Sequence, residues 1–174
     1  MVMTYDINTL DVSIGLTNPK SPANVGAILR AAGCYQAGQI FYSGSRYDNA
    51  AKFHTDTKNA SLDIPLQQTP CLLQAKPAGA KLVCVDLVEG AQPLPEFEHP
   101  QQAYYVFGPE DGTIDQAIID AADAVVYVPT KGCMNLAASV NVILYDRLAK
   151  NASRNQGDEL IRRSRDVNNK VKVR

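Results

Sequence analysis

Short runs of β-branched and aromatic residues alternate along this chain with segments in which apolar residues recur at helical spacing. The runs predict strands at 12–16, 40–42, 81–86, 104–107 and 124–128, and the spacing predicts helices at 23–37, 113–122 and 135–148. Strands that alternate with helices form a parallel sheet with helices packed against both faces. The predicted fold class is therefore α/β, with a mostly parallel sheet covered on both sides.

Two stretches between these elements show no clean period. Residues 42–62 are polar, which is typical either of a surface connection or of a lid over a binding site. Residues 92–102 are rich in proline and acidic side chains and predict an extended loop. The apolar pattern stops near Asn151 and resumes weakly at Leu160. We therefore expect one domain over residues 1–151 and a C-terminal extension over residues 152–174.

The net charge of −1 hides an uneven distribution. From Arg147 to Arg174 the chain has nine basic and three acidic residues, a net of +6, which leaves −7 for the rest. A basic arm on an acidic body is typical of proteins that contact nucleic-acid phosphates. It is equally typical of a solvated tail that keeps a protein soluble, so charge alone leaves both interpretations open.

Several classes of site and location are not indicated. No apolar run approaches the roughly 20 residues of a membrane span, and no signal-peptide pattern is visible. The four cysteines form no C-x-x-C pair and have no histidine at zinc-ligand spacing. We therefore expect reduced cysteines, three of them buried among apolar neighbours, no metal, and a cytoplasmic location. His54 and His99 are expected at the surface rather than in catalysis.

Glycines and polar side chains gather at three corners where a predicted strand meets a helix, at 18–30, 106–112 and 128–136. Ligands bind at such corners in open α/β sheets, so the three together predict one composite site. The glycine patterns of dinucleotide-binding and P-loop sites are both missing from the sequence.

The polar residues of these corners each allow two interpretations. Asn24 is either a helix cap or a site residue, and Arg30 is either part of a surface ion pair or a site residue. Glu110 either stabilises a helix N-terminus or lies against a ligand between the flanking glycines. Asn135 would ordinarily cap the last long helix.

The three corners, in this order and spacing, resemble the signature motifs of the SPOUT superfamily of RNA methyltransferases, SpoU/TrmH type. The motifs stand here as Asn24-Val25-Gly26-Ala27-Ile28-Leu29-Arg30, as Gly108-Pro109-Glu110 with Gly112, and as Cys133-Met134-Asn135 with Tyr145-Asp146. The resemblance runs over about residues 12–150. Two positions depart from the motifs: Cys133 replaces a serine, and one residue rather than two separates Glu110 from Gly112.

This resemblance implies a deep trefoil knot near the C-terminus, S-adenosylmethionine as cofactor, and a homodimer whose active site uses both subunits. The implied reaction is methyl transfer to a ribose 2′-hydroxyl of RNA, with tRNA favoured over rRNA. The alternative is a catalytically impaired knotted RNA-binding module that retains the cofactor pocket. The implied catalytic arginine is Arg30, with Asn24, Glu110 and Asn135 holding the site. The implied cofactor-binding positions are Asp86, Leu87, Gly90, Gly108, Glu110, Gly112, Val128, Pro129, Cys133 and Leu136.

Overall fold

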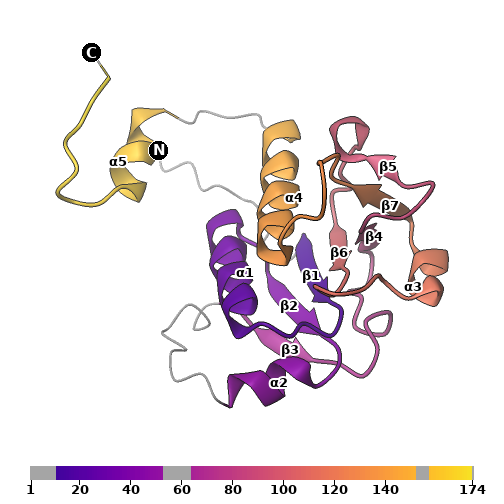
Figure 1. Ribbon diagram of the computed structural model, residues 1–174. Coiled ribbons are helices and arrows are strands. Elements are labelled where there is room, and N and C mark those ends of the chain that lie inside the picture. Colours follow the sequence, from indigo (N-terminus) through magenta and orange to yellow (C-terminus); the bar gives the residue numbers. More distant parts are fainter. Residues whose placement is uncertain (1–10, 53–63, 152–156, 174) are drawn as a thin grey trace.

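The computed structural model describes residues 11–52, 64–151 and 157–173. Seven parallel strands form one sheet in the spatial order β3-β2-β1-β6-β4-β7-β5 (Figure 1). The strands are β1 (Val12–Leu16), β2 (Gln39–Tyr42), β3 (Leu66–Gln68), β4 (Lys81–Val85), β5 (Gln92–Pro93), β6 (Ala103–Phe107) and β7 (Ala124–Tyr127). The predicted parallel α/β sheet is thus confirmed.

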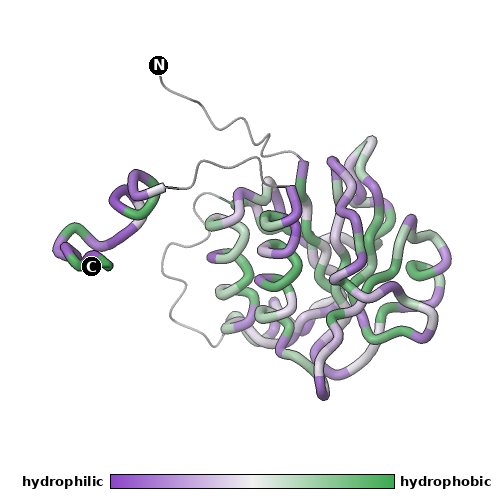
Figure 2. Tube along the Cα trace, turned by 90° about the horizontal axis from the view of Figure 1, so that it is seen from above, coloured by the Kyte–Doolittle hydropathy of each residue, from purple (hydrophilic) through white to green (hydrophobic). Residues whose placement is uncertain are grey.

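Helices pack against both faces of this sheet. The long helices α1 (Pro22–Tyr35) and α4 (Leu136–Lys150) lie side by side on one face, as the view from above shows (Figure 2). The short helix α3 (Gln116–Ala121) contributes to the apolar cluster on the other face. Two further short helices are α2 (Arg46–Ala51) and α5 (Asp158–Ser164). None of the helices in the described ranges has the length and apolarity needed to cross a bilayer.

Local chemistry explains where α1 begins and ends. The Ser21 side chain caps the helix by accepting a hydrogen bond from the Asn24 N–H at 3.2 Å, and Pro22 occupies the first turn. Gln36 ends the helix in the left-handed conformation, with φ of 59°. Because Ser21 is the cap, the cap interpretation of Asn24 is wrong, and the Asn24 side chain is available for other contacts.

Alternate residues of the central strands enter two separate apolar clusters. On β4, Val83 and Val85 face α1 and α4, whereas Leu82 and Cys84 face the opposite side. This alternation is the period of two expected of a strand. It explains why these strands read as continuous apolar runs, since both faces of a parallel sheet are covered.

Several predictions made from local pattern are wrong. The stretch 92–102 is not a plain loop, because it holds β5 and a turn of 3₁₀ helix, η1 (Leu94–Glu96), with Leu94 and Phe97 buried. The polar stretch 42–62 contains α2, while residues 53–63, and His54 with them, lie outside the described residues. Strand β3 was not expected. Of the cysteines only Cys84 is fully buried, while Cys34 and Cys133 are exposed.

His99 is also not a surface residue. Its side chain is fully buried, with Nδ1 2.7 Å from the Tyr105 hydroxyl and Nε2 2.8 Å from the Asp146 carboxylate. Burial lowers the pKa of His99 and outweighs Asp146, which alone would raise it. The ring is therefore neutral near pH 7, with its Nε2–H donating to Asp146. Lys150 lies 2.8 Å from the same carboxylate, so this cluster fixes the last turn of α4.

Candidate functional site

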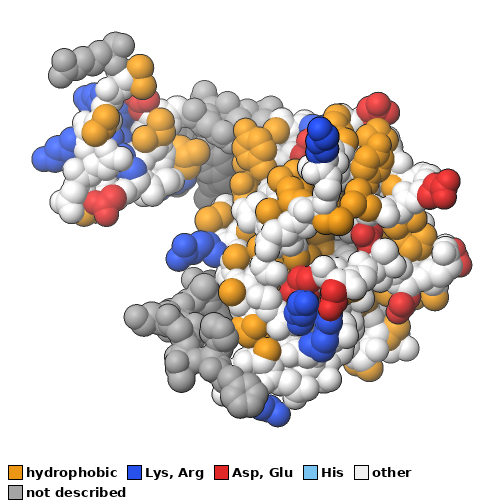
Figure 3. All heavy atoms as spheres, in the orientation of Figure 1, with side chains coloured by type: hydrophobic (Ala, Val, Ile, Leu, Met, Phe, Trp, Pro, Cys, Tyr) orange, Lys and Arg blue, Asp and Glu red, His pale blue; other side chains and the backbone are white. Residues whose placement is uncertain are grey.

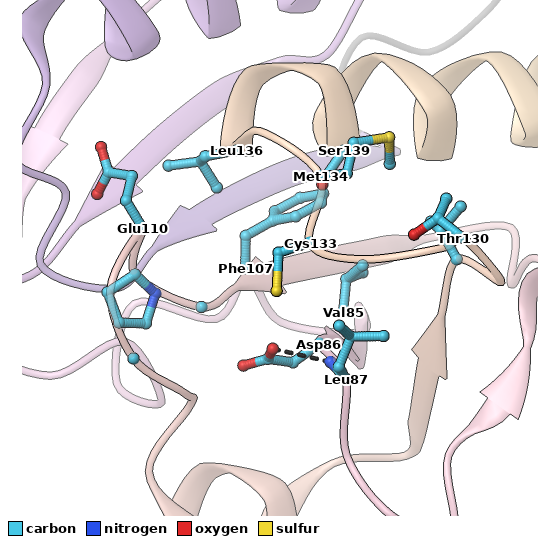
Figure 4. Close-up of a pocket in the computed structure, with 14 residues that line it drawn as sticks. Val85, Asp86, Leu87, Phe107, Glu110, Thr130, Cys133, Met134, Leu136 and Ser139 are labelled. Carbon is cyan, nitrogen blue, oxygen red and sulfur yellow. Dashed lines mark hydrogen bonds between the residues drawn. The ribbon is translucent and has the colours of Figure 1, made fainter.

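The carboxyl ends of β4, β6 and β7 surround a pocket of about 130 Å³, closed on one side by the first turn of α4 (Figure 4). Adjacent strands of a parallel sheet end at the same edge, and this is where open α/β sheets bind ligands. The lining residues are Val85, Asp86, Leu87, Phe107, Gly108, Pro109, Glu110, Gly112, Val128, Thr130, Cys133, Met134, Leu136 and Ser139. The lining therefore comes from the second and third corners and from the end of β4, and no residue of the first corner, 18–30, is part of it.

Asp86 and Gly108 set the floor of this pocket. The two Asp86 carboxylate oxygens accept hydrogen bonds from the backbone N–H groups of Leu87, at 2.8 Å, and Ile114, at 2.9 Å. A Cβ at position 108 would collide with the same carboxylate, so any larger residue there would have to push the Asp86 side chain aside. The carboxylate thus ties the end of β4 to the chain beyond β6, and both of its oxygens are engaged.

Three side chains join the three corners directly. The Asn135 side-chain amide donates to the Asn24 side-chain oxygen at 2.9 Å, and the Asn24 amide in turn donates to Glu110 at 3.3 Å. The Asn135 side-chain oxygen accepts from the Ala138 N–H at 3.1 Å, so Asn135 caps α4 at the same time. The cap prediction for Asn135 is confirmed. Capping uses only the side-chain oxygen, which leaves the NH₂ group to donate to Asn24.

Glu110 anchors this network on the first corner. Its carboxylate accepts backbone N–H groups from Lys20, at 3.1 Å, and Ser21, at 3.2 Å, in addition to the Asn24 amide. Burial favours a raised pKa for Glu110, but the hydrogen bonds from backbone N–H groups and from Asn24 outweigh it and lower the pKa below its usual range. Glu110 is therefore ionised at neutral pH and serves as a hydrogen-bond acceptor rather than as a proton donor.

The remaining predicted residues do not all meet at the pocket. Arg30 lies six residues beyond Asn24 on α1, which is about 9 Å along the helix, and its exposed side chain is not part of the lining. Gly90, with φ of 87°, and Pro129 follow β4 and β7 but also fall outside the lining. The other predicted cofactor positions all line the pocket: Asp86, Leu87, Gly108, Glu110, Gly112, Val128, Cys133 and Leu136.

Sequence reasoning missed several lining residues, among them Thr130 and Ser139. Thr130 donates its hydroxyl to the Gly132 carbonyl at 2.8 Å, and Ser139 donates to the Asn135 carbonyl at 3.1 Å. Thr130 directly follows Pro129 and Ser139 lies one helical turn after Asn135, so proximity to the predicted corners was the available signal. The Cys133 thiol points into the pocket toward Asp86 and Leu87, whereas the Glu110 carboxylate points away (Figure 4).

Three solved structures share this fold at low sequence identity. The TrmH/SpoU tRNA modifying enzyme of A. aeolicus is 18% identical with a TM-score of 0.70, over 81% of this chain and 75% of that one. The SpoU methyltransferase AviRb of Streptomyces viridochromogenes, solved with AdoMet, is 20% identical with a TM-score of 0.63, over 79% of this chain and 59% of that one. A structure described for 2-OH methylation of C/U34 on tRNA is 21% identical with a TM-score of 0.61, over 80% and 95%.

Identities this low establish the shared fold and leave activity and substrate to other arguments. No curated protein matches the sequence. The sequence pattern of the SpoU rRNA Methylase family, however, matches residues 11–145, which includes all three corners and the pocket. On that match, the chain belongs to the SpoU rRNA methylase family.

Proposed function

We propose that the protein is an S-adenosylmethionine-dependent RNA methyltransferase that modifies a ribose 2′-hydroxyl, with tRNA as the favoured substrate over rRNA. The observation that carries this proposal is the hydrogen-bonded chain from Asn135 through Asn24 to Glu110 at the edge of the pocket. A module that only bound RNA would not need a polar network joining the three corners beside a cavity. The network therefore favours the enzyme over the impaired binding module.

The pocket has the chemistry that a nucleoside cofactor requires. Leu87 keeps 53% of its surface exposed at the pocket, a large apolar side chain that a flat adenine ring would cover. Gly108 and Val128 would offer backbone groups, and Thr130 and Ser139 would add hydroxyls close by. When bound, S-adenosylmethionine supplies a methyl group on a sulfonium, which leaves positioning as the main task of the protein.

The reacting hydroxyl must also lose its proton. The two carboxylates of the lining, Asp86 and Glu110, are already held by backbone N–H groups, and Glu110 points out of the pocket. An arginine guanidinium is not deprotonated in proteins, so Arg30 would lower the proton affinity of the hydroxyl and hold an RNA phosphate, whose oxygen would accept the proton. Because Arg30 lies outside the pocket of its own chain, we propose that it serves the pocket of a partner subunit.

A homodimer would bring Arg30 to such a pocket. From the sequence, the apolar positions Val140, Ile143, Leu144 and Leu148 form a stripe along α4 that we expected at a subunit contact, but the first three are buried within the protomer. The outer side of α4 instead carries Tyr145, which is 60% exposed. This side is our candidate for the dimer contact. A monomer in static light scattering would contradict it.

Substrate and location follow the same proposal. The basic arm after residue 151 would lie along RNA phosphates, and the four cysteines, all free, fit a reducing cytoplasm.

We also propose the trefoil knot. Strand β7 lies between β4 and β5, and the chain returns from there to α4, which supports threading past the 86–91 connection. Threading predicts slow refolding from guanidinium, so rapid single-phase recovery of the fold would oppose a knot.

The direct test is incubation of the protein with labelled S-adenosylmethionine and unmodified tRNA, followed by nucleoside analysis. We expect a 2′-O-methylated nucleoside, and a methylated base instead would refute ribose specificity. Calorimetry with S-adenosylmethionine and with S-adenosylhomocysteine tests the pocket separately from the reaction. The absence of heat with both ligands at high protein concentration would refute the assigned cofactor.

The role of Arg30 has its own test. Arg30→Ala should abolish methyl transfer and leave cofactor binding nearly unchanged. If the site is shared between subunits, Arg30→Ala mixed with Gly108→Ala, at a cofactor concentration too low for the Gly108→Ala pocket to fill, should regain about a quarter of the wild-type rate, since half of the random dimers hold one complete site. A mixture as inactive as its two components would place Arg30 and the pocket of one chain in the same site.

A further inference from the structure

One cluster of charges beside the site is not explained by the proposed reaction. Arg46, at the start of α2, donates from Nη1 to both carboxylate oxygens of Asp111, each at 2.9 Å. The Lys20 ammonium lies 3.4 Å from the same carboxylate. In the space-filling view, basic side chains adjoin acidic side chains near the centre of the visible face (Figure 3).

This charge cluster adjoins the Asn135–Asn24–Glu110 network. Asp111 follows Glu110 in the chain, and the backbone N–H of Lys20 is one of the donors that hold Glu110. Lys20 therefore contacts the network through its backbone and Asp111 through its side chain. A polynucleotide that presents a ribose at the pocket would have its neighbouring phosphates near this cluster.

The Arg46 guanidinium is held independently of Asp111. Its Nε, at 3.0 Å, and its Nη2 both donate to the backbone carbonyl of Asn18. That edge of the guanidinium is fixed on the main chain, and the opposite nitrogen, Nη1, carries the carboxylate. Loss of Asp111 from the cluster would therefore leave Arg46 in place with donors ready for another anion.

The carboxylate itself is weakly held. The Asp111 side chain is 47% exposed, and its two partners, Arg46 and Lys20, are 33% and 52% exposed. Ion pairs this open to water contribute little to stability and exchange readily. The hydrogen bond from Arg46 lowers the pKa of Asp111, so the group is a carboxylate at neutral pH and competes with other anions. Glu110, by contrast, is fixed by backbone donors.

We propose that Arg46 and Lys20 form a binding site for a phosphate of the RNA substrate, and that the Asp111 carboxylate occupies this site until RNA displaces it. The proposal rests on RNA being the substrate, as argued above, and adds the residues that position it. Asp111 then acts as an internal competitor: it sets the affinity for RNA without touching the cofactor.

Variants of the two sides of the ion pair should have opposite effects on RNA binding. Binding of fluorescein-labelled unmodified tRNA would be followed by anisotropy across a salt series. Removing the competitor, in Asp111→Asn, should tighten binding by about twofold to fivefold, the range set by an exposed pair. Arg46→Gln should weaken binding about tenfold and reduce the salt slope by about 0.7 to 0.9. Lys20→Gln, which leaves the Arg46 anchor intact, should weaken binding by a smaller factor.

The double variant separates competition from a structural role. Adding Asp111→Asn to Arg46→Gln should tighten binding by less than Asp111→Asn does in the wild type, since only Lys20 is then left for the carboxylate to block. Lys81→Gln is the matched control, because Lys81 forms an exposed pair with Asp123 at 3.4 Å and should change nothing. Cofactor calorimetry should be unaltered in the three single variants, and thermal unfolding should be unaltered in Asp111→Asn and Lys20→Gln, whose ion pairs are open to water.

Each other outcome has a definite meaning. If Asp111→Asn weakens tRNA binding, the pair merely holds the corner together and the proposal is overturned. If Arg46→Gln and Lys20→Gln bind and methylate tRNA as the wild type does, the phosphate site is wrong while the enzyme stands. If no methyl transfer occurs but binding follows the expected order, the site stands and the proposed activity fails. A wild-type protein that does not bind tRNA refutes both.

Discussion

Replacing Glu110 by glutamine removes one negative charge and reverses the hydrogen-bonding character of one atom. The carboxylate accepts from Ser21 N–H and the Asn24 amide on one oxygen and from Lys20 N–H on the other. The glutamine oxygen can serve one of these positions, but its NH₂ then faces a donor. Asn24 cannot turn its oxygen to compensate, because that oxygen accepts from Asn135.

The loss is one unsatisfied donor at a half-buried site. That costs about 1 to 2 kcal/mol, toward the lower part of the usual range because water reaches the Lys20 side. For a chain of this size the melting temperature should fall by about 2 to 8 °C. Thermal unfolding of Glu110→Gln at pH 7 measures this, with the exposed Glu98→Gln as a control that should leave the melting temperature unchanged.

The pH dependence of the stability difference tests whether the ionised form of Glu110 is the one that stabilises the fold. The folded pKa of Glu110 is lowered, so its contribution is fully present above the unfolded value of about 4.3 and is lost as pH falls through the folded value. The difference between wild type and Glu110→Gln should therefore shrink on acidification, since a protonated glutamate resembles glutamine. Equal melting temperatures at pH 7, or a difference that persists in acid, would refute this account of the network.

Three further predictions concern the pocket floor, the buried histidine and the basic arm. Gly108→Ala should push the Asp86 carboxylate aside, lowering stability by about 1 to 3 kcal/mol and weakening cofactor binding in calorimetry. Gly33→Ala is the control, because a Cβ at that position of α1 meets open space. Equal cofactor affinity in the two variants would refute the close contact at Gly108. The pKa of His99 is lowered, mainly by burial, so its contribution to stability is present above about pH 6.5 and is lost as pH falls below that value. The urea midpoint should therefore drop from pH 7 to pH 5, and His99→Gln should make this drop smaller. A drop of the same size in the variant would assign the pH dependence to other groups. Deleting residues 152–174 removes seven basic residues and should weaken tRNA binding and reduce its salt slope without altering the dimer, whereas unchanged affinity across the salt series would rule out the arm as an RNA contact.

The sheet and the location of the pocket could be predicted because both follow from local pattern. A buried strand such as Tyr104–Phe107 reads as an apolar run, and a glycine directly after it marks a close approach. The start of α4 at Asn135 was equally visible, since a cap residue leaves a signal in the sequence. Each of these features depends on residues that are near neighbours in the chain.

Features that depend on distant residues could not be predicted. Strand β5 is a two-residue edge strand that pairs with β7, which lies about thirty residues later in the chain. Nothing in the sequence Gln92–Pro93 indicates this pairing. His99 looked like a loop residue because Asp146 and Tyr105, which surround it, come later in the chain. The pairing of Arg46 with Asp111 joins a stretch without clear period to a motif, a link that only the folded chain makes.

The Asn135–Asn24–Glu110 network has a consequence for how the protein is made. A ribosome that has synthesised the first 130 residues has already incorporated Asn24 and Glu110, along with every strand of the described sheet. The nascent chain at that stage still lacks Asn135 and all of α4, so one face of the sheet has only α1 to cover it and the pocket has no outer wall. The site therefore forms only after α4 has been synthesised, and a chain that stops before Asn135 is left with an uncovered apolar face and an incomplete site.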